Sequence, residues 1–244
     1  MSNKVEIVEV SPVKKRSPVV VTGFTGSGFI GNSALMFIVR NKGFKLRAHL
    51  RSEQIPPMML LIDGEPTNAF RVYGSERNDL LFVISDALVE PESTWAVGRS
   101  LMEWFKGMGV QEIYSVEGMP YAPIQEPRTL FSYGTRNKDL SQHGVVPTRE
   151  GAVQGVSAVL LEESLKTDIS YVTILVPTQL MSTIDYGGSA AVIDVMNSLF
   201  KLGVDATPLR KSDEMRRQMM ERGRKGESRG FLSSLRRRPD SGAS

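Results

Sequence analysis

A glycine-rich turn near residue 28 has the residue types and spacing of a phosphate-binding loop. The stretch Gly26-Ser-Gly-Phe-Ile-Gly31 is a G-x-G-x-x-G sequence that follows an apolar β-branched run and opens a predicted helix. In that context, glycines let the backbone N–H groups at a helix N-terminus approach the pyrophosphate of a dinucleotide. Gly23, Gly26, Gly28 and Gly31 are therefore the candidate ligand loop.

The companion features of a dinucleotide site are missing from the sequence. The strand predicted after the helix ends at His49-Leu-Arg51 and offers no carboxylate for a ribose hydroxyl, although Arg51 would suit a 2′-phosphate. No tyrosine is followed four residues later by lysine, the pair that short-chain dehydrogenases use for proton transfer. The same glycines also fit a tight strand-to-helix turn with close backbone packing. Both interpretations stay open at this point.

The other reactive residue types form no catalytic or metal-binding pattern. The chain has no cysteine and two histidines, His49 and His143, which excludes disulfides, thiolate metal sites and a three-histidine metal site within one chain. Phe29-Ile30 stands where a P-loop has Lys-Ser/Thr, and no Gly-x-Ser-x-Gly elbow occurs. We interpret acidic residues near strand ends, such as Asp63 and Asp86, as caps or solvated side chains. We therefore predict no catalytic residue, no metal site and no cofactor.

The C-terminal part of the chain carries candidate residues for protein contacts. Met215, Met219 and Met220 are four and five residues apart, so they share a face if a helix forms there. Methionine side chains are flexible and suit adaptable apolar contacts. An arginine run follows, made of Arg236, Arg237 and Arg238. It lacks the interleaved aromatics of a nucleic-acid stacking platform, so we do not expect nucleic acid as a partner. An acidic protein partner and simple solvation remain the two interpretations of these arginines.

Apolar runs and amphipathic stretches alternate around the glycine turn. The patterns predict strands over 19–22, 44–50, 58–62, 69–73, 80–85, 111–116 and 171–176, and helices over 31–41, 91–108, 154–165 and 190–202. Prolines at 56, 57 and 66 predict turns, and Ser93 and Thr94 are candidate N-caps. Residues 118–146 read as a long surface excursion with a hairpin at 129–133. The alternation predicts an α/β fold, a three-layer α/β/α domain with a mainly parallel sheet.

Charge and composition divide the chain into three parts. Residues 209–244 carry a net charge of +6, and the rest of the chain carries −3. Apolar residues become sparse from about residue 208. We predict a flexible leader over 1–17, a single domain over 18–208, and a basic, mostly disordered tail over 209–244 in which 211–225 can form an exposed helix. The sequence has no apolar run of membrane-spanning length and no signal-peptide pattern, so we expect a cytoplasmic protein that does not contact membranes.

Five segments in a fixed order resemble the proteasome assembly chaperone family in its archaeal form. The resemblance covers about residues 18–210. The segments are VVVTGFTGSGFIGNSALMFIV, RVYGSERNDLLFVISD, WAVGRSLMEWFKGMGVQEIYSVEG, GAVQGVSAVLLEESLKTDISYVTILVPT and SAAVIDVMNSLFKLGVDATPL. The resemblance implies a fold similar to nucleoside phosphorylases and a non-enzymatic, ATP-independent role. Members of the family form homo-oligomers that bind proteasome α-subunits and promote assembly of the core particle.

Members of the family commonly dock through a C-terminal ending of hydrophobic residue, tyrosine and any residue. The last residues here are Asp-Ser-Gly-Ala-Ser, and the last tyrosine is Tyr186. We therefore expect binding to use the folded body, the Arg-rich tail, or a paralogous chaperone that supplies the missing anchor. Our first hypothesis is a chaperone-like binding protein of proteasome α-subunits. The alternative is an enzyme that holds a nucleotide or other phosphorylated ligand in the loop 23–31.

Overall fold

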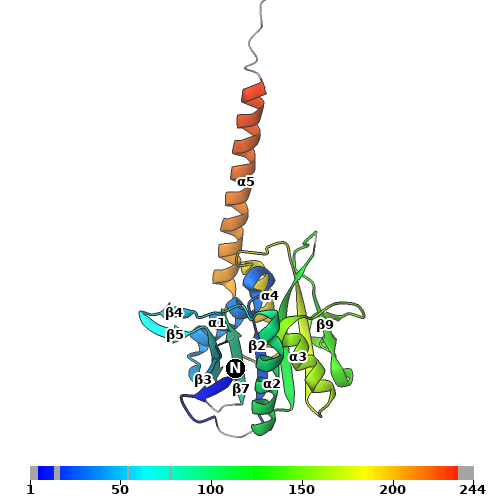
Figure 1. The fold of residues 1–244 in the computed structure, drawn as a ribbon. Coiled ribbons are helices and arrows are strands. Elements are labelled where there is room, and N and C mark those ends of the chain that lie inside the picture. Colours follow the sequence, from blue (N-terminus) through cyan, green and yellow to red (C-terminus); the bar gives the residue numbers. More distant parts are fainter. Residues whose placement is uncertain (1–4, 14–16, 54, 77–78, 122, 236–244) are drawn as a thin grey trace, which may run out of the picture.

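A nine-stranded sheet forms the middle layer of the computed structural model, which describes residues 5–13, 17–53, 55–76, 79–121 and 123–235 (Figure 1). Its strands are β1 (Glu6–Glu9), β2 (Val19–Gly23), β3 (Lys45–Arg51), β6 (Phe70–Gly74), β7 (Leu80–Ser85), β8 (Glu112–Pro120), β9 (Leu130–Gly134), β10 (Val145–Pro147) and β11 (Ser170–Thr178). They lie in the order β1-β3-β6-β7-β2-β8-β11-β9-β10.

The four central strands β7, β2, β8 and β11 are parallel, whereas β1, β3 and β6 pair antiparallel on one side. On the other side β9 is antiparallel to β11, and β10 is parallel to β9. Every residue of β7 and β11 is buried, and both strands are mainly apolar, since helices cover both faces of a parallel sheet. The predicted mainly parallel sheet is confirmed.

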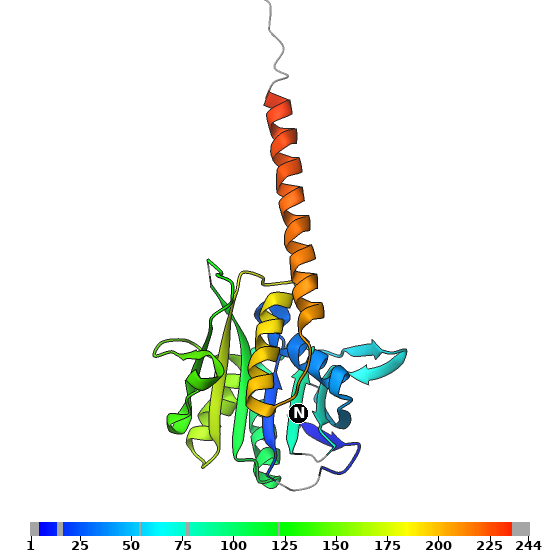
Figure 2. The same ribbon diagram turned by 180° about the vertical axis from the view of Figure 1, so that it is seen from behind.

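Two helices cover each face of the sheet (Figures 1 and 2). Helices α1 (Ile30–Lys42) and α4 (Tyr186–Phe200) pack on one face, where Ile38 and Ile193 share a core with Val116. Helices α2 (Pro91–Gly107) and α3 (Gly155–Leu165) pack on the other, where Leu101 and Leu160 share a second core with Tyr171. This arrangement is the predicted three-layer α/β/α fold.

Three local predictions were wrong. Pro66 lies inside a strand, because β4 (Met59–Ile62) and β5 (Glu65–Asn68) form a separate hairpin that turns at Asp63-Gly64 and projects from the domain (Figure 1). A two-stranded ribbon leaves half of its N–H groups unpaired, so it tolerates proline. The segment 129–133 forms no hairpin of its own; it becomes β9 and pairs with β11 and β10. Helix α2 starts at Pro91, so Ser93 and Thr94 lie inside its first turn.

Helix α5 (Thr207–Leu235) projects away from the three layers (Figures 1 and 2). It includes the range 211–225 for which the sequence predicts an exposed helix, and its side chains are described as far as Arg222. The arginine run Arg236, Arg237 and Arg238 lies outside the described residues. In the part of the chain that the structure describes, no helix is long and apolar enough to cross a bilayer.

The glycine turn between β2 and α1 packs against backbone rather than around an open space. A Cβ atom placed on Gly31 would lie 2.6 Å from the carbonyl oxygen of Val116 on β8. A Cβ on Gly23 would lie 2.5 Å from the carbonyl carbon of Gly31. Farther along β8, a Cβ on Gly118 would lie 1.9 Å from the carbonyl oxygen of Ser27. The glycines therefore let the start of α1 sit directly on the sheet.

Asp185 fastens the same turn to the start of α4. Its backbone N–H donates to the carbonyl of Gly28 (2.9 Å), and its Oδ1 accepts from the N–H of Gly188 (2.9 Å), which caps α4. Its Oδ2 accepts from Thr178 Oγ1 and from Arg128 Nη1, each at 2.6 Å. The side chains of Asp185 and Arg128 are 3% and 4% exposed. Burial acts to raise the pKa of Asp185, but the Thr178 and Gly188 hydrogen bonds and the Arg128 charge hold that pKa below its ordinary value.

Replacing Gly118 with alanine should lower the free energy of unfolding by about 1–3 kcal/mol, because the new methyl group displaces the backbone at Ser27. Gly107→Ala is the matched control, since Gly107 lies in α2 with no atom near its would-be Cβ. It should raise stability by up to about 1 kcal/mol. Urea unfolding followed by circular dichroism at one protein concentration measures both. Equal stabilities of the two variants would contradict the packing described for the turn.

Replacing Asp185 with asparagine should destabilise the fold by about 3 kcal/mol at pH 7, because the buried Arg128 loses its buried carboxylate partner and keeps only the exposed Glu126. A carboxyl whose pKa is depressed by folding stabilises the protein above the ordinary aspartate range, and this contribution is lost as pH falls through the folded-state pKa. The difference in free energy of unfolding between wild type and Asp185→Asn should therefore become smaller at acidic pH. Asp194→Asn, which opens an exposed pair with Arg210, should cost under about 1 kcal/mol. If the difference in free energy of unfolding between wild type and Asp185→Asn does not change with pH, the depressed pKa assigned to Asp185 is refuted.

Candidate functional site

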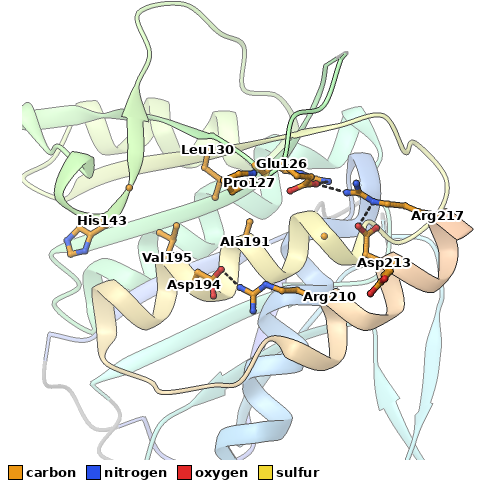
Figure 3. A pocket seen from close by; sticks show the side chains of 14 residues that line it. Glu126, Pro127, Leu130, His143, Ala191, Asp194, Val195, Arg210, Asp213 and Arg217 are labelled. Carbon is orange, nitrogen blue, oxygen red and sulfur yellow. Dashed lines mark hydrogen bonds and ion pairs between the residues drawn. The ribbon is translucent and has the colours of Figure 1, made fainter.

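A cavity of about 530 Å³ opens where α5 leaves the domain (Figure 3). It lies between α4, the first turns of α5, β9 and the segment 126–128, and we call it the basal cavity. Its floor is apolar and is formed by Pro127, Leu130, Ala191 and Val195. Its rim is charged, with residues of both signs. An apolar floor inside a charged rim is suited to a protein side chain or a small amphipathic group.

A chain of ion pairs runs along this rim from the domain into α5. Glu126 Oε1 accepts from Arg128 Nη2 (3.0 Å) and from Arg217 Nη2 (2.6 Å). Arg217 Nε then donates to Asp213 Oδ2 (2.7 Å), whose other oxygen accepts from Arg216 (2.7 Å). Figure 3 shows the Glu126–Arg217–Asp213 part of this chain. Since Arg128 also pairs with Asp185, charged contacts connect the glycine turn to the base of α5.

The base of α5 lies against α4, and the ion pairs that join it to other segments, Glu126–Arg217 and Asp194–Arg210, are exposed. The Asp213 side chain is 8% exposed, and it lies so close to α4 that a Cβ on Gly187 would come within 2.8 Å of its Oδ2. Burial acts to lower the pKa of Arg217, but the hydrogen bond to Glu126 and the charges of Asp213 and Glu126 raise that pKa above its ordinary value. A second contact, between Arg210 and Asp194, ties α5 to α4 at an exposed position.

The three candidate methionines extend from this base into solvent. Met215, Met219 and Met220 are 55%, 71% and 55% exposed on α5. All three lie within two helical turns of Asp213, so they belong to the part of α5 that is closest to the domain. The structure therefore places the methionines close to the charged rim, which helical spacing alone did not predict.

The glycine loop is placed apart from the basal cavity. Gly28 has a positive φ of 68° and contacts Asp185 and Thr178 side chains, and Gly23 and Gly31 contact backbone. Gly26 has space around it, the nearest atom to its would-be Cβ being the Phe24 carbonyl oxygen at 4.0 Å. Close packing against backbone at Gly23 and Gly31, and against side chains at Gly28, accounts for these three glycines without a ligand.

The remaining polar residues singled out from the sequence have structural partners. Asp86 is neither a cap nor simply solvated: it forms an ion pair with the fully buried Arg71 and accepts from Asn32 Nδ2 (3.0 Å). His143 lies at the edge of the basal cavity, with its Nδ1 2.8 Å from Ser198 Oγ. Burial and the Arg51 charge lower the pKa of His49. Among the described residues, no three His, Asp or Glu side chains are grouped to hold a metal ion.

Sequence reasoning missed the residues that build the rim and one buried acid. The i, i+3 and i, i+4 spacing of Asp213 to Arg216 and Arg217 is a signal that could have been used. Nothing local points to Glu126 or Arg128, because their partners are distant in sequence. On the opposite face, Glu117 accepts hydrogen bonds from Ser115 and Ser157, and burial raises its pKa although these bonds offset part of the rise.

Solved structures with the same fold include two Pyrococcus furiosus proteins whose descriptions refer to the proteasome. The chain is 25% identical to Pyrococcus furiosus PbaA, described as an archaeal homolog of proteasome-assembly chaperone, with a TM-score of 0.81 over 95% of this chain and 96% of PbaA. It shares the fold of Pyrococcus furiosus PbaB, described as an archaeal proteasome activator, at 17% identity and a TM-score of 0.80 over 91% of this chain and 100% of PbaB.

A curated relative and a family profile agree with these structures. An uncharacterized protein of Methanocaldococcus jannaschii is 23% identical over 219 residues, which cover 88% of each chain. The profile of the PAC2 family matches residues 20–222, well over half of the 244 residues. The matched range contains the sheet from Val20 in β2 onward, the residues of the basal cavity and the methionines of α5. The resemblance to proteasome assembly chaperones seen in the sequence is thereby confirmed, and the chain belongs to the PAC2 family.

Proposed function

We propose that this protein is a non-catalytic chaperone of proteasome assembly that binds proteasome α-subunits without using ATP. The observation that carries the proposal is the projecting helix α5, which presents exposed methionines from a base fixed by ion pairs. The likeness to PbaA over nearly the whole of both chains supports the choice of partner.

A helix in the state of α5 is suited to binding another protein. Polar helices that stand away from a domain gain little stability from packing, so they are commonly completed by a partner. Exposed Met215, Met219 and Met220 offer apolar area with low shape specificity, which lets one surface fit related subunits. The net charge of +6 over residues 209–244 favours an acidic partner surface and would speed encounter at low salt.

The glycine turn supports an ATP-independent role. Backbone atoms of Val116 and Ser27 lie where side chains of the turn and of β8 would otherwise be, and Asp185 places a carboxylate beside Gly28. A buried carboxylate next to the turn disfavours a phosphate anion there. We further propose that the protein acts as a homo-oligomer, with a paralogous chaperone as a second partner, since α5 offers one exposed face to either.

The test is native mass spectrometry of the full chain mixed with proteasome α-subunits from the same source. Wild-type protein should form a complex of defined stoichiometry, with no added nucleotide. Changing Met215, Met219 and Met220 together to glutamine, which keeps helix propensity, should weaken the complex by about tenfold or more, since buried apolar anchors dominate interface energetics.

The matched control is Leu61→Gln, which removes an equally exposed apolar side chain (77% exposed) from the β4–β5 hairpin. It should leave the affinity within about twofold of wild type. Failure of wild-type protein to bind α-subunits would end the proposal. Equal losses of affinity in the triple variant and in Leu61→Gln would show that the α5 methionines are not the binding surface. A nucleotide that raises the melting temperature at saturation would instead favour the ligand-loop hypothesis.

A further inference from the structure

The rim of the basal cavity carries carboxylate oxygens that the rest of the described chain does not use. Glu126, Asp194 and Glu214 line the cavity, and all three are exposed. Among the described residues, each of these carboxylates accepts hydrogen bonds through one oxygen only, which is Oε1 of Glu126, Oδ2 of Asp194 and Oε1 of Glu214. Both oxygens of a carboxylate can accept hydrogen bonds. Each of the three can therefore accept a further donor from outside.

The positive charges that line the cavity already have partners. The lining arginines and their carboxylate partners are Arg128 with Asp185, Arg210 with Asp194, and Arg217 with Asp213. Glu214, in contrast, forms no ion pair with any described residue and accepts only a 3.4 Å hydrogen bond from Gln218. The free oxygens of the rim attract a cation and repel an anion. The cavity is therefore suited to a positively charged group.

The floor of the cavity favours a cation that has an apolar stem. Pro127 is exposed and Ala191 is half-buried, so a group that enters the cavity can touch both. Arginine and lysine side chains lay their aliphatic stems along apolar surface and keep the charged head at its polar edge. The planar guanidinium of arginine also matches a carboxylate with two parallel N–H groups. Arginine is therefore the side chain that suits the floor and the rim together.

The arginine run that the sequence places after α5 cannot reach the basal cavity of its own chain. Arg236, Arg237 and Arg238 follow Leu235, the last residue of α5. At about 1.5 Å per residue, Leu235 lies about 32 Å along the helix from Glu214. Three extended residues span only about 10 Å. The run can therefore bind a basal cavity only in another copy of the chain.

We propose that the basal cavity binds the arginine run 236–238 of a second copy of this chain. The inference rests on the homo-oligomer proposed above, and it names the two surfaces that meet in that oligomer. The arginine stems lie on the apolar floor at Pro127 and Ala191. Their guanidinium groups bond the free carboxylate oxygens of Glu126, Asp194 and Glu214.

Analytical ultracentrifugation of the full chain at one fixed salt concentration measures the self-association. Changing Arg236, Arg237 and Arg238 together to glutamine should weaken self-association by about tenfold or more, because hydrogen bonds between charged groups are lost. Glu214→Gln removes one carboxylate of the rim and should weaken it by about threefold or more.

Two matched controls separate the proposed contact from a general effect of charge. Changing Arg224, Lys225 and Arg229 together to glutamine also removes three positive charges from the C-terminal part of the chain, but outside the run. Glu103→Gln removes an exposed glutamate from α2, away from the cavity. Each control should leave self-association within about twofold of wild type.

Cross-linking tests which segments meet, because the chain has no cysteine of its own. Lys211→Cys places a thiol on α5 one turn before Glu214, and Asp240→Cys places one two residues after the run. When the two single-cysteine proteins are mixed, a short bismaleimide should join them into a covalent dimer. The same mixture in which the Asp240→Cys chain also carries glutamine at 236–238 should give much less of it.

Unchanged self-association in the 236–238 variant overturns the proposal, and so does the absence of a cross-link in the mixture. A monomeric wild-type protein overturns it as well; if Glu214→Gln then weakens binding of α-subunits, the cavity belongs to a basic segment of that partner. The proposed function fails separately. If self-association responds as expected and native mass spectrometry shows no complex with α-subunits, the inference about the cavity stands and the chaperone proposal does not.

Discussion

The buried ion pair between Asp185 and Arg128 is the contact on which the arrangement of this molecule depends. It joins four segments that the fold must bring together: the glycine turn, the end of β11, the segment before β9, and the start of α4. A pair of charges removed from water is costly unless hydrogen bonds complete both partners. Here Thr178 and the Gly188 N–H donate to Asp185, and the Pro177 carbonyl accepts from Arg128, whose Nε has no partner among the described residues. Because Arg128 also contacts Glu126, the same pair supports the attachment of α5.

The glycine turn illustrates how one sequence pattern serves two physical purposes. Phosphate loops and tight strand-to-helix turns both require residues without side chains, since in each case backbone comes close to something. In this protein the close neighbours of Gly23 and Gly31 are backbone atoms of the chain itself. The requirement for glycine was visible in the sequence, but the identity of the neighbour was not, because β8 lies about ninety residues away.

Sequence patterns predicted the three-layer architecture because strands that are buried on both faces of a sheet are mainly apolar, as β7 and β11 are. They failed where a local rule was overridden, as at Pro66, which an isolated hairpin tolerates. The candidate methionines could be named in advance from helical spacing, and they are exposed on α5. The ion pairs that hold α5 could not, since Glu126 and Arg217 are 91 residues apart and neither sits in a recognisable motif.

Helix α5 is long enough to reach well beyond the domain. At about 1.5 Å per residue, its 29 residues span about 43 Å, more than the thickness of a small domain. If the helix rotated by about ten degrees about its base, its far end would move by about 7 Å, which is roughly the spacing between neighbouring side chains. A small movement at the contacts among Glu126, Arg217 and Asp213 would therefore produce a much larger movement at the far end of the helix.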